Sequence, residues 1–132
     1  MNVCDFINTI YLGDRAVKSV WIDCWGKEVK VEIDCISRIR GKKWNFYIDE
    51  DVVNGRLVFF DVCYVSFGSS GLVPNDYIDD LCAVEDEGGG YLIKLTAGFL
   101  GDELHHKDAV MEIKAKSMAI EDPLRPGQYI IA

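Results

Sequence analysis

The chain has 132 residues, of which 49% are hydrophobic and 27% are charged, and its formal net charge at pH 7 is −8. This composition is typical of a globular protein and argues against disorder, and no apolar run approaches the roughly 20 residues that a membrane-spanning helix needs. An acidic surface repels nucleic acids and anionic membranes, so we expect neither as a partner, and it attracts basic proteins.

The five cysteines are odd in number and include no C-x-x-C motif, which argues against a disulfide framework and against a zinc knuckle. Cys24, Cys35 and Cys63 lie in apolar runs, where we expect reduced, buried, structural side chains. The first residues contain neither a basic leader nor a cleavable apolar segment, so we expect the protein to be cytoplasmic.

A short helix is predicted near the N-terminus, over about residues 4–12. Phe6 and Ile10 recur at helical spacing, Asn2 is placed to cap the start, and Gly13 is a stop signal. After this helix the period of the hydrophobic pattern changes from 3.6 to 2, which indicates strands.

The segment KSVWIDCWGKEVKVEIDC predicts a β-hairpin with a two-residue turn at Gly26 and Lys27. The expected pairs on the apolar face are Val20–Ile33, Ile22–Val31 and Cys24–Val29. The expected pairs on the other face are Trp21–Glu32, Asp23–Lys30 and Trp25–Glu28. Both the sorting of side chains and the opposite-charge pair support this register.

Further strands follow along the chain. Asn54–Gly55 suits a type I′ turn, which predicts a second hairpin with Tyr47 facing Val62 and Phe46 facing Cys63. Residues 68–76 form a loop by composition, and YIDDLCAVEDE and YLIKLTAGFL read as strands joined by the glycines at 88–90. The last strand, AVMEIKAKSMAIE, changes period near Ser117, which suggests a bulge.

Together these segments predict a single domain over residues 1–132, with a β core over about 17–122 and an extended C-terminal tail over 123–132. The fold class is mainly β: an antiparallel sandwich or barrel of about six or seven strands with one short N-terminal helix. An unpaired edge strand would also allow a homodimer.

Both histidines lie in GDELHHKDA, residues 101–109, which we place in a loop between the last two long strands. Adjacent His105 and His106 would point in opposite directions in extended backbone, and zinc needs three or four converging ligands. We therefore expect a solvated loop and neither a metal nor another cofactor. Carboxylate clusters such as Asp79–Asp80 are better explained as strand-edge protection than as paired catalytic acids. No nucleophile or phosphate-binding motif occurs, so we predict no catalytic residues.

Two tryptophans on the charged face of the first hairpin are the most informative surface feature. Indoles exposed two positions apart would be either covered by the N-terminal helix or the C-terminal tail, or used as anchors for a partner. In the second case the contact residues would be Trp21, Asp23, Trp25, Glu28 and Glu32.

The order of elements, with a Trp-bearing hairpin, the strand VFFDVCYVSF and the acidic segment PNDYIDD, resembles the small β-rich bacterial proteins of polymorphic-toxin immunity families, in particular immunity protein 50-like chains. The resemblance spans about residues 5–122. It implies a cytoplasmic antidote that blocks a basic toxin by binding, and it supplies no individual site residues.

Two hypotheses follow. The first is a non-catalytic bacterial binding protein, immunity-like, that occludes a basic, toxin-like protein partner with an acidic, aromatic-bearing sheet face. The alternative is a β-barrel carrier whose interior, lined by residues such as Phe59, Phe67, Leu95 and Phe99, holds an apolar small molecule.

Overall fold

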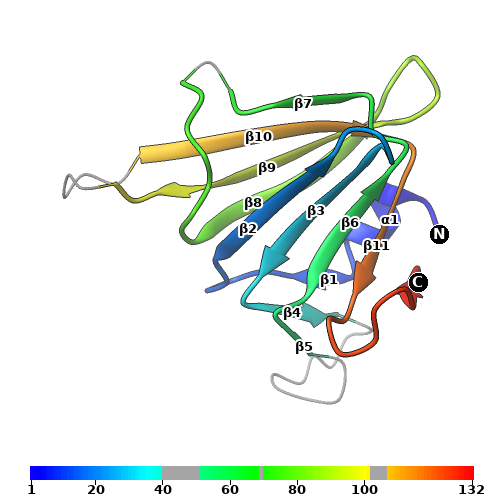
Figure 1. The fold of residues 1–132 in the computed structure, drawn as a ribbon, viewed down its shortest axis with the longest axis horizontal. Coiled ribbons are helices and arrows are strands. Elements are labelled where there is room, and N and C mark those ends of the chain that lie inside the picture. The colour runs from blue at the N-terminus through cyan, green and yellow to red at the C-terminus, as the bar shows by residue number, and fades with distance from the viewer. Residues whose placement is uncertain (40–50, 69, 102–106) are drawn as a thin grey trace.

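A computed structural model describes residues 1–39, 51–68, 70–101 and 107–132 (Figure 1). Within these ranges the chain forms one helix, α1 (Val3–Ile7), and twelve strands in three antiparallel sheets. The strands are β1 (Ile10–Tyr11), β2 (Val17–Asp23), β3 (Glu28–Ile33), β4 (Cys35–Arg38), β5 (Val52–Val53), β6 (Arg56–Phe60), β7 (Tyr64–Ser66), β8 (Ile78–Glu85), β9 (Tyr91–Phe99), β10 (Lys107–Ala115), β11 (Ser117–Glu121) and β12 (Tyr129–Ile130). The predicted class, mainly antiparallel β with one short N-terminal helix, is confirmed.

The largest sheet has the strand order β12-β11-β6-β3-β2, the second has β7-β10-β9-β8, and a small third sheet has β1-β4-β5. None of them closes into a barrel in the described ranges, so the premise of the barrel carrier is not met. The expected strand number of about six or seven matches only the longer strands, because β1, β4, β5, β7 and β12 have two to four residues each. Such strands are too short to show an alternating pattern.

The two larger sheets turn their apolar faces to one common core. Along β3, β9 and β10 every second side chain is buried, as alternation requires. The large apolar side chains buried in this core include Phe6, Val29, Val31, Ile33, Ile36, Leu57, Phe59, Ile93, Leu95, Met111, Ile113 and Ile120. Phe59 and Leu95, which the carrier hypothesis placed around a ligand, are part of this packed core.

The chain passes from one large sheet to the other twice at a single corner. Only Lys116 separates β10 from β11, and residues 61–63 separate β6 from β7. The amide of Lys116 donates to the carbonyl of Phe60 at 3.0 Å, which ties the two crossings together. The period change near Ser117 therefore marks a strand that switches sheets rather than a bulge, as occurs at the corners of packed sheets.

Helix α1 begins as predicted and ends earlier. The Asn2 side chain caps it by accepting a hydrogen bond from the amide of Asp5 at 2.8 Å. The hydroxyl of Thr9 donates to the carbonyl of Phe6 at 2.7 Å and satisfies an end group of the helix. The chain then becomes strand β1, so Gly13 does not end the helix, and the interpretation of residues 8–12 as helical was wrong.

The first hairpin forms with a register two residues away from the predicted one. Asp23 pairs with Glu28, Trp21 with Lys30, and Ile22 with Val29, around a four-residue turn at 24–27. The Asp23 side chain accepts a hydrogen bond from the amide of Gly26 at 2.9 Å and starts the turn early. Because a shift of two keeps each side chain on its face, the apolar and polar faces survive, but Cys24 and Trp25 leave the strand.

The chain turns at Asn54–Gly55, but only Asn54 has a positive φ, of 55°, so the turn is not of type I′ and does not make the predicted second hairpin. Before the turn β5 pairs with β4, and after it β6 pairs with β3 on one side and β11 on the other. Both edges of β6 are thus occupied. Phe46 and Tyr47, the expected partners of Cys63 and Val62, lie outside the described residues.

The segment after β11 is only partly extended. Turns follow Asp122, and β12 then pairs with β11 at the edge of the largest sheet. The described residues include no helix with the length and apolar character needed to cross a membrane.

Candidate interaction surface

The tip of the first hairpin carries an indole that nothing in the described chain covers. Trp25 is 99% exposed. It lies in the turn between β2 and β3, because the Asp23 side chain fixes the turn two residues earlier than the glycine position suggested. Neither α1 nor the C-terminal tail packs over it, and an indole contributes more apolar area than almost any other side chain.

Two carboxylates face each other directly below this tip. Asp23 and Glu28 are cross-strand partners, where like charges destabilise a hairpin. Asp23 uses one oxygen to accept from the Gly26 amide, and neither residue forms a salt bridge within the described ranges. The hairpin therefore ends in an exposed indole above two acidic side chains that form no salt bridge with another described residue.

A shallow apolar groove adjoins the tip. It has a volume of about 260 Å³ and lies between the end of the hairpin and the strand β7 with the residues before it. Ile22 and Tyr64 line it and are 46% and 44% exposed. We refer to Ile22, Asp23, Trp25, Glu28 and Tyr64 as the tip surface.

The two other predicted contact residues, Trp21 and Glu32, lie on the outer face of β2 and β3, where cations surround them. The guanidinium of Arg56 lies 5.0 Å from the centre of the Trp21 ring, and Lys18 forms a salt bridge with Glu32 at 3.7 Å. Trp21 is 44% exposed. Positive side chains therefore balance the negative charge on this part of the sheet face. Among the described residues, the acidic and aromatic side chains that we expected along the whole face are without such cations only at the tip.

Sequence reasoning missed Tyr64 and Ile22 as surface residues. Ile22 has the alternation of a core residue, but it lines the groove beside β7 and is partly exposed there. Tyr64 begins β7, a three-residue strand with no periodicity of its own. The sequence DCWG did carry a signal for the exposed Trp25, since an aspartate three residues before a glycine is a common turn opening.

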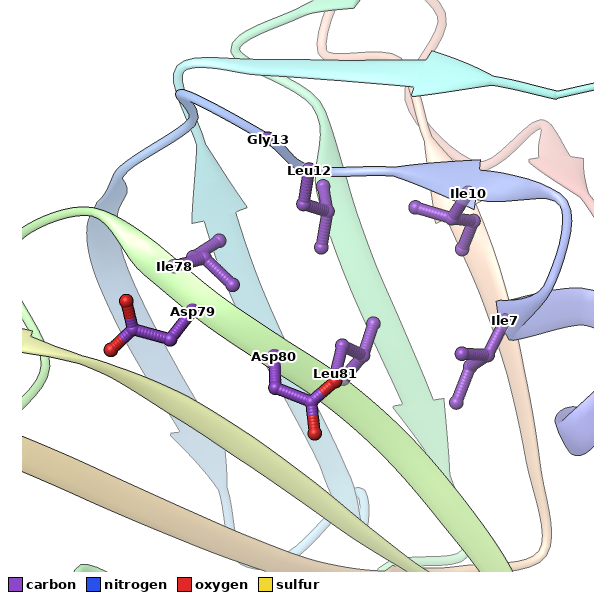
Figure 2. A pocket seen from close by; sticks show the side chains of 8 residues that line it. All are labelled: Ile7, Ile10, Leu12, Gly13, Ile78, Asp79, Asp80 and Leu81. Atoms are coloured by element: carbon purple, nitrogen blue, oxygen red, sulfur yellow. The ribbon is translucent and has the colours of Figure 1, made fainter.

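A second depression lies in the seam between β1 and β8 (Figure 2). Its volume is about 210 Å³, below the range usual for ligand sites. Isoleucine and leucine side chains surround it, and the carboxylates of Asp79 and Asp80 lie along β8 at its margin. No histidine, lysine or hydroxyl lines it beside them, so the described residues give this pair no acid–base partner.

The cysteines differ from expectation in burial. All five are free thiols, but Cys24, Cys63 and Cys82 are exposed, and Cys4 and Cys35 are half-buried. The shifted hairpin register moves Cys24 into the turn, and the corner places Cys63 in a connection, so the prediction that Cys24, Cys35 and Cys63 are buried was wrong.

His105 and His106 lie outside the described residues. Among the residues that the structure describes, no group of three or more histidine, cysteine, aspartate or glutamate side chains is placed to hold a metal ion.

The family model described as "Family of unknown function (DUF6258)" matches residues 1–132. No curated protein and no solved structure matches the chain.

Proposed function

The chain belongs to this family of unknown function over its whole length, and we propose that it is a non-catalytic binding protein that occludes a basic protein partner. The contact is centred on the tip surface. We infer that the two larger sheets form a sandwich-type scaffold whose rigid hairpin presents that surface.

The observation that carries this proposal is the 99% exposure of Trp25 above the facing carboxylates Asp23 and Glu28. An uncovered indole adds nothing to the stability of the fold, and a like-charge pair lowers the stability of the free protein. Such departures from local stability rules are expected at functional sites. Tryptophan is also enriched among the residues that dominate binding energy, and acidic groups around it speed association with a basic partner.

The resemblance to immunity proteins of polymorphic toxins suggests the kind of partner. On this proposal the protein is a cytoplasmic bacterial antidote that blocks a basic toxin. The net charge of −8 suits such a partner. Trp21 and Glu32, on the adjoining strand face, would lie at the margin of the contact.

Photo-cross-linking tests the proposal. A photoreactive phenylalanine analogue replaces Trp25 in one full-length variant and Leu124 in a matched control. Leu124 is 88% exposed and precedes β12, at the opposite edge of the largest sheet from β2. We expect a basic protein to be captured in the native cells from position 25 and not from position 124.

The captured partner is then titrated with purified variants. Trp25→Ala should weaken binding by about 30-fold or more, as expected for an anchor worth about 2 kcal/mol. Glu28→Gln should slow association and reduce its dependence on salt. Equal capture from positions 25 and 124, or unchanged affinity in Trp25→Ala, would refute the assignment of the tip surface.

A further inference from the structure

A larger cleft lies on the other side of residues 62 and 63, at the corner where the chain changes sheets. Its volume is about 360 Å³, within the range of small-molecule sites. Three lysines line it, Lys27, Lys114 and Lys116, in a protein whose net charge is −8. We call it the corner cleft.

One backbone segment holds the three lysines together. The amide of Val62 donates to the carbonyl of Lys27 at 2.8 Å, and the amide of Cys63 donates to the carbonyl of Lys114 at 3.1 Å. The amide of Lys116 donates to the carbonyl of Phe60 at 3.0 Å. The backbones of three lysines, from the hairpin turn, from β10 and from the link to β11, are thus fixed around residues 60–63, so the corner brings these three positions to one cleft.

The positive charge of the cleft is only partly offset. None of the three lysines forms a salt bridge within the described ranges. Two carboxylates, Asp61 and Asp86, also line the cleft, which leaves a local excess of one positive charge. Asp61 adopts a left-handed conformation with φ 53°, which aspartate visits more readily than most residues.

The rest of the lining is apolar or aromatic. Gly90 approaches β10 so closely that a Cβ at this position would lie 2.8 Å from the carbonyl oxygen of Ala115. The glycine turn therefore packs against the corner and brings Tyr91, the next residue, to the lining of the cleft, which also includes Val62. A ligand with both an anionic head and an apolar or aromatic body would match these two kinds of lining.

We propose that the corner cleft binds a small organic oxyanion, a carboxylate or phosphate carried on an aromatic body. The lysines contact the oxyanion, and Tyr91 with Val62 contacts the body. The cleft shares Lys27, Val62 and Cys63 with the groove beside the tip surface, and the Lys114 ammonium lies 5.3 Å from the centre of the Tyr64 ring. The proposed ligand is nonetheless distinct from the protein partner, and its binding does not require that partner.

An NMR titration of the ¹⁵N-labelled full chain tests this site with phenyl phosphate, benzoate and inorganic phosphate as probes. We expect saturable amide shifts at Val62, Cys63, Gly90 and Lys116 with phenyl phosphate. Benzoate should bind at the same place, and inorganic phosphate should bind more weakly than phenyl phosphate because it lacks the aromatic body. The spectra also report directly whether each variant is folded.

Two variants with opposite expected effects on the affinity for phenyl phosphate make the test more specific. Lys116→Gln should weaken phenyl phosphate about two- to fivefold, the effect of one partly exposed charge. Asp61→Asn, which tolerates the left-handed backbone, should strengthen it by a similar factor. Lys94→Gln is the matched control, since Lys94 is an exposed lysine on β9 outside the cleft. Absence of saturable shifts, or an equal loss in Lys116→Gln and Lys94→Gln, would overturn the proposal.

Discussion

Lys30 donates to the carboxylate of Glu121 at 3.0 Å, although the two residues lie 91 positions apart. Arg56, on the strand between them, donates to the same oxygen at 3.1 Å, and the amide of Gly127 donates to the other oxygen at 3.2 Å. The Glu121 side chain is only 2% exposed. One buried carboxylate thus joins β3, β6 and β11 to the segment before β12.

Replacing this carboxylate should destabilise the fold. In Glu121→Gln the charge-assisted hydrogen bonds to Lys30 and Arg56 become neutral ones, and we expect a loss of about 2 kcal/mol at pH 7 in urea unfolding. Lys30 and Arg56 are each 26% exposed at the side chain, so water can partly solvate them and limit the loss. Glu85→Gln is the control, because Glu85 is exposed and forms no salt bridge with another residue that the structure describes.

The same carboxylate predicts a pH dependence. Burial acts to raise its pKa, but hydrogen bonds from Lys30, Gly127 and Arg56 outweigh burial and hold the pKa below its ordinary value of 4.5. A carboxyl group whose pKa is lowered in the folded protein stabilises the fold at pH values above its ordinary pKa. This contribution to the free energy of unfolding is lost as the pH falls through the lowered pKa. The stability gap between wild type and Glu121→Gln should therefore be complete at neutral pH and shrink below pH 4.5. A gap that does not change with pH would contradict the ion-pair assignment.

The two tryptophans of the first hairpin should behave differently on removal. Trp25→Ala should leave the free energy of unfolding within about 0.5 kcal/mol of wild type, because the indole contacts almost nothing. Trp21→Ala should cost about 1 to 2 kcal/mol, since it loses the stacked Arg56 guanidinium and a half-buried ring. Thermal and urea denaturation measure both. Equal losses would mean that the tip is covered.

Removing one of the two facing carboxylates should raise the stability of the free protein and weaken its binding to a basic partner. Glu28→Gln removes the like-charge contact with Asp23 and should stabilise the free protein by about 0.2 to 1 kcal/mol. If the tip surface binds a basic partner, the same change should lower affinity. A destabilised Glu28→Gln variant would show that the pair does not repel. The control is Glu85→Gln, since Glu85 is an exposed glutamate on β8 whose cross-strand partner is Tyr91 rather than an acidic residue.

Most of the strands could be predicted because their information is local. The alternation along β9 and β10 and the cap at Asn2 each depend on a few consecutive residues. The hairpin register could not be obtained in this way. The aspartate side chain at position 23 competes with the glycine signal at position 26, and only the folded turn shows which one fixes the loop.

The pairing of strands that lie far apart in the sequence could not be predicted either. Asn54 and Gly55 predicted a turn correctly, but whether β6 then pairs with its neighbour in sequence depends on β3 and β11 already flanking it. The corner cleft is hidden for the same reason, since Lys27 and Lys116 meet only through hydrogen bonds to residues 60–63. The exposure of Trp25 was one of the two expected alternatives, but its position in the turn rather than on the strand follows from the register and was missed with it.

The cap of α1 should matter beyond the helix itself. Asn2→Ala removes the acceptor for the Asp5 amide and should cost about 1 kcal/mol, whereas Asn2→Asp should retain most of the stability. The Cys4 thiol donates to the Ala83 carbonyl at 3.4 Å, so α1 lies against the edge strand β8. Because an uncovered strand edge promotes association, Asn2→Ala should also show more dimer by size-exclusion chromatography with light scattering. A monomeric variant of unchanged stability would contradict this role.

The exposed thiols should differ in reactivity according to their surroundings. Partial burial of its sulfur and the neighbouring Asp80 raise the pKa of Cys82, and Lys94 opposes them. Since the thiolate is the reactive form, Cys82 should be alkylated more slowly at pH 8 than Cys24 in the hairpin turn, as peptide mass spectrometry of iodoacetamide-treated native protein would measure. Asp80→Asn should speed the reaction of Cys82 by lowering its pKa and leave Cys24 unchanged, because Asp80 lies on β8 and Cys24 does not border it. Unaltered Cys82 kinetics in Asp80→Asn would mean that the carboxylate does not act on the thiol, and burial alone would then have to account for its slow reaction.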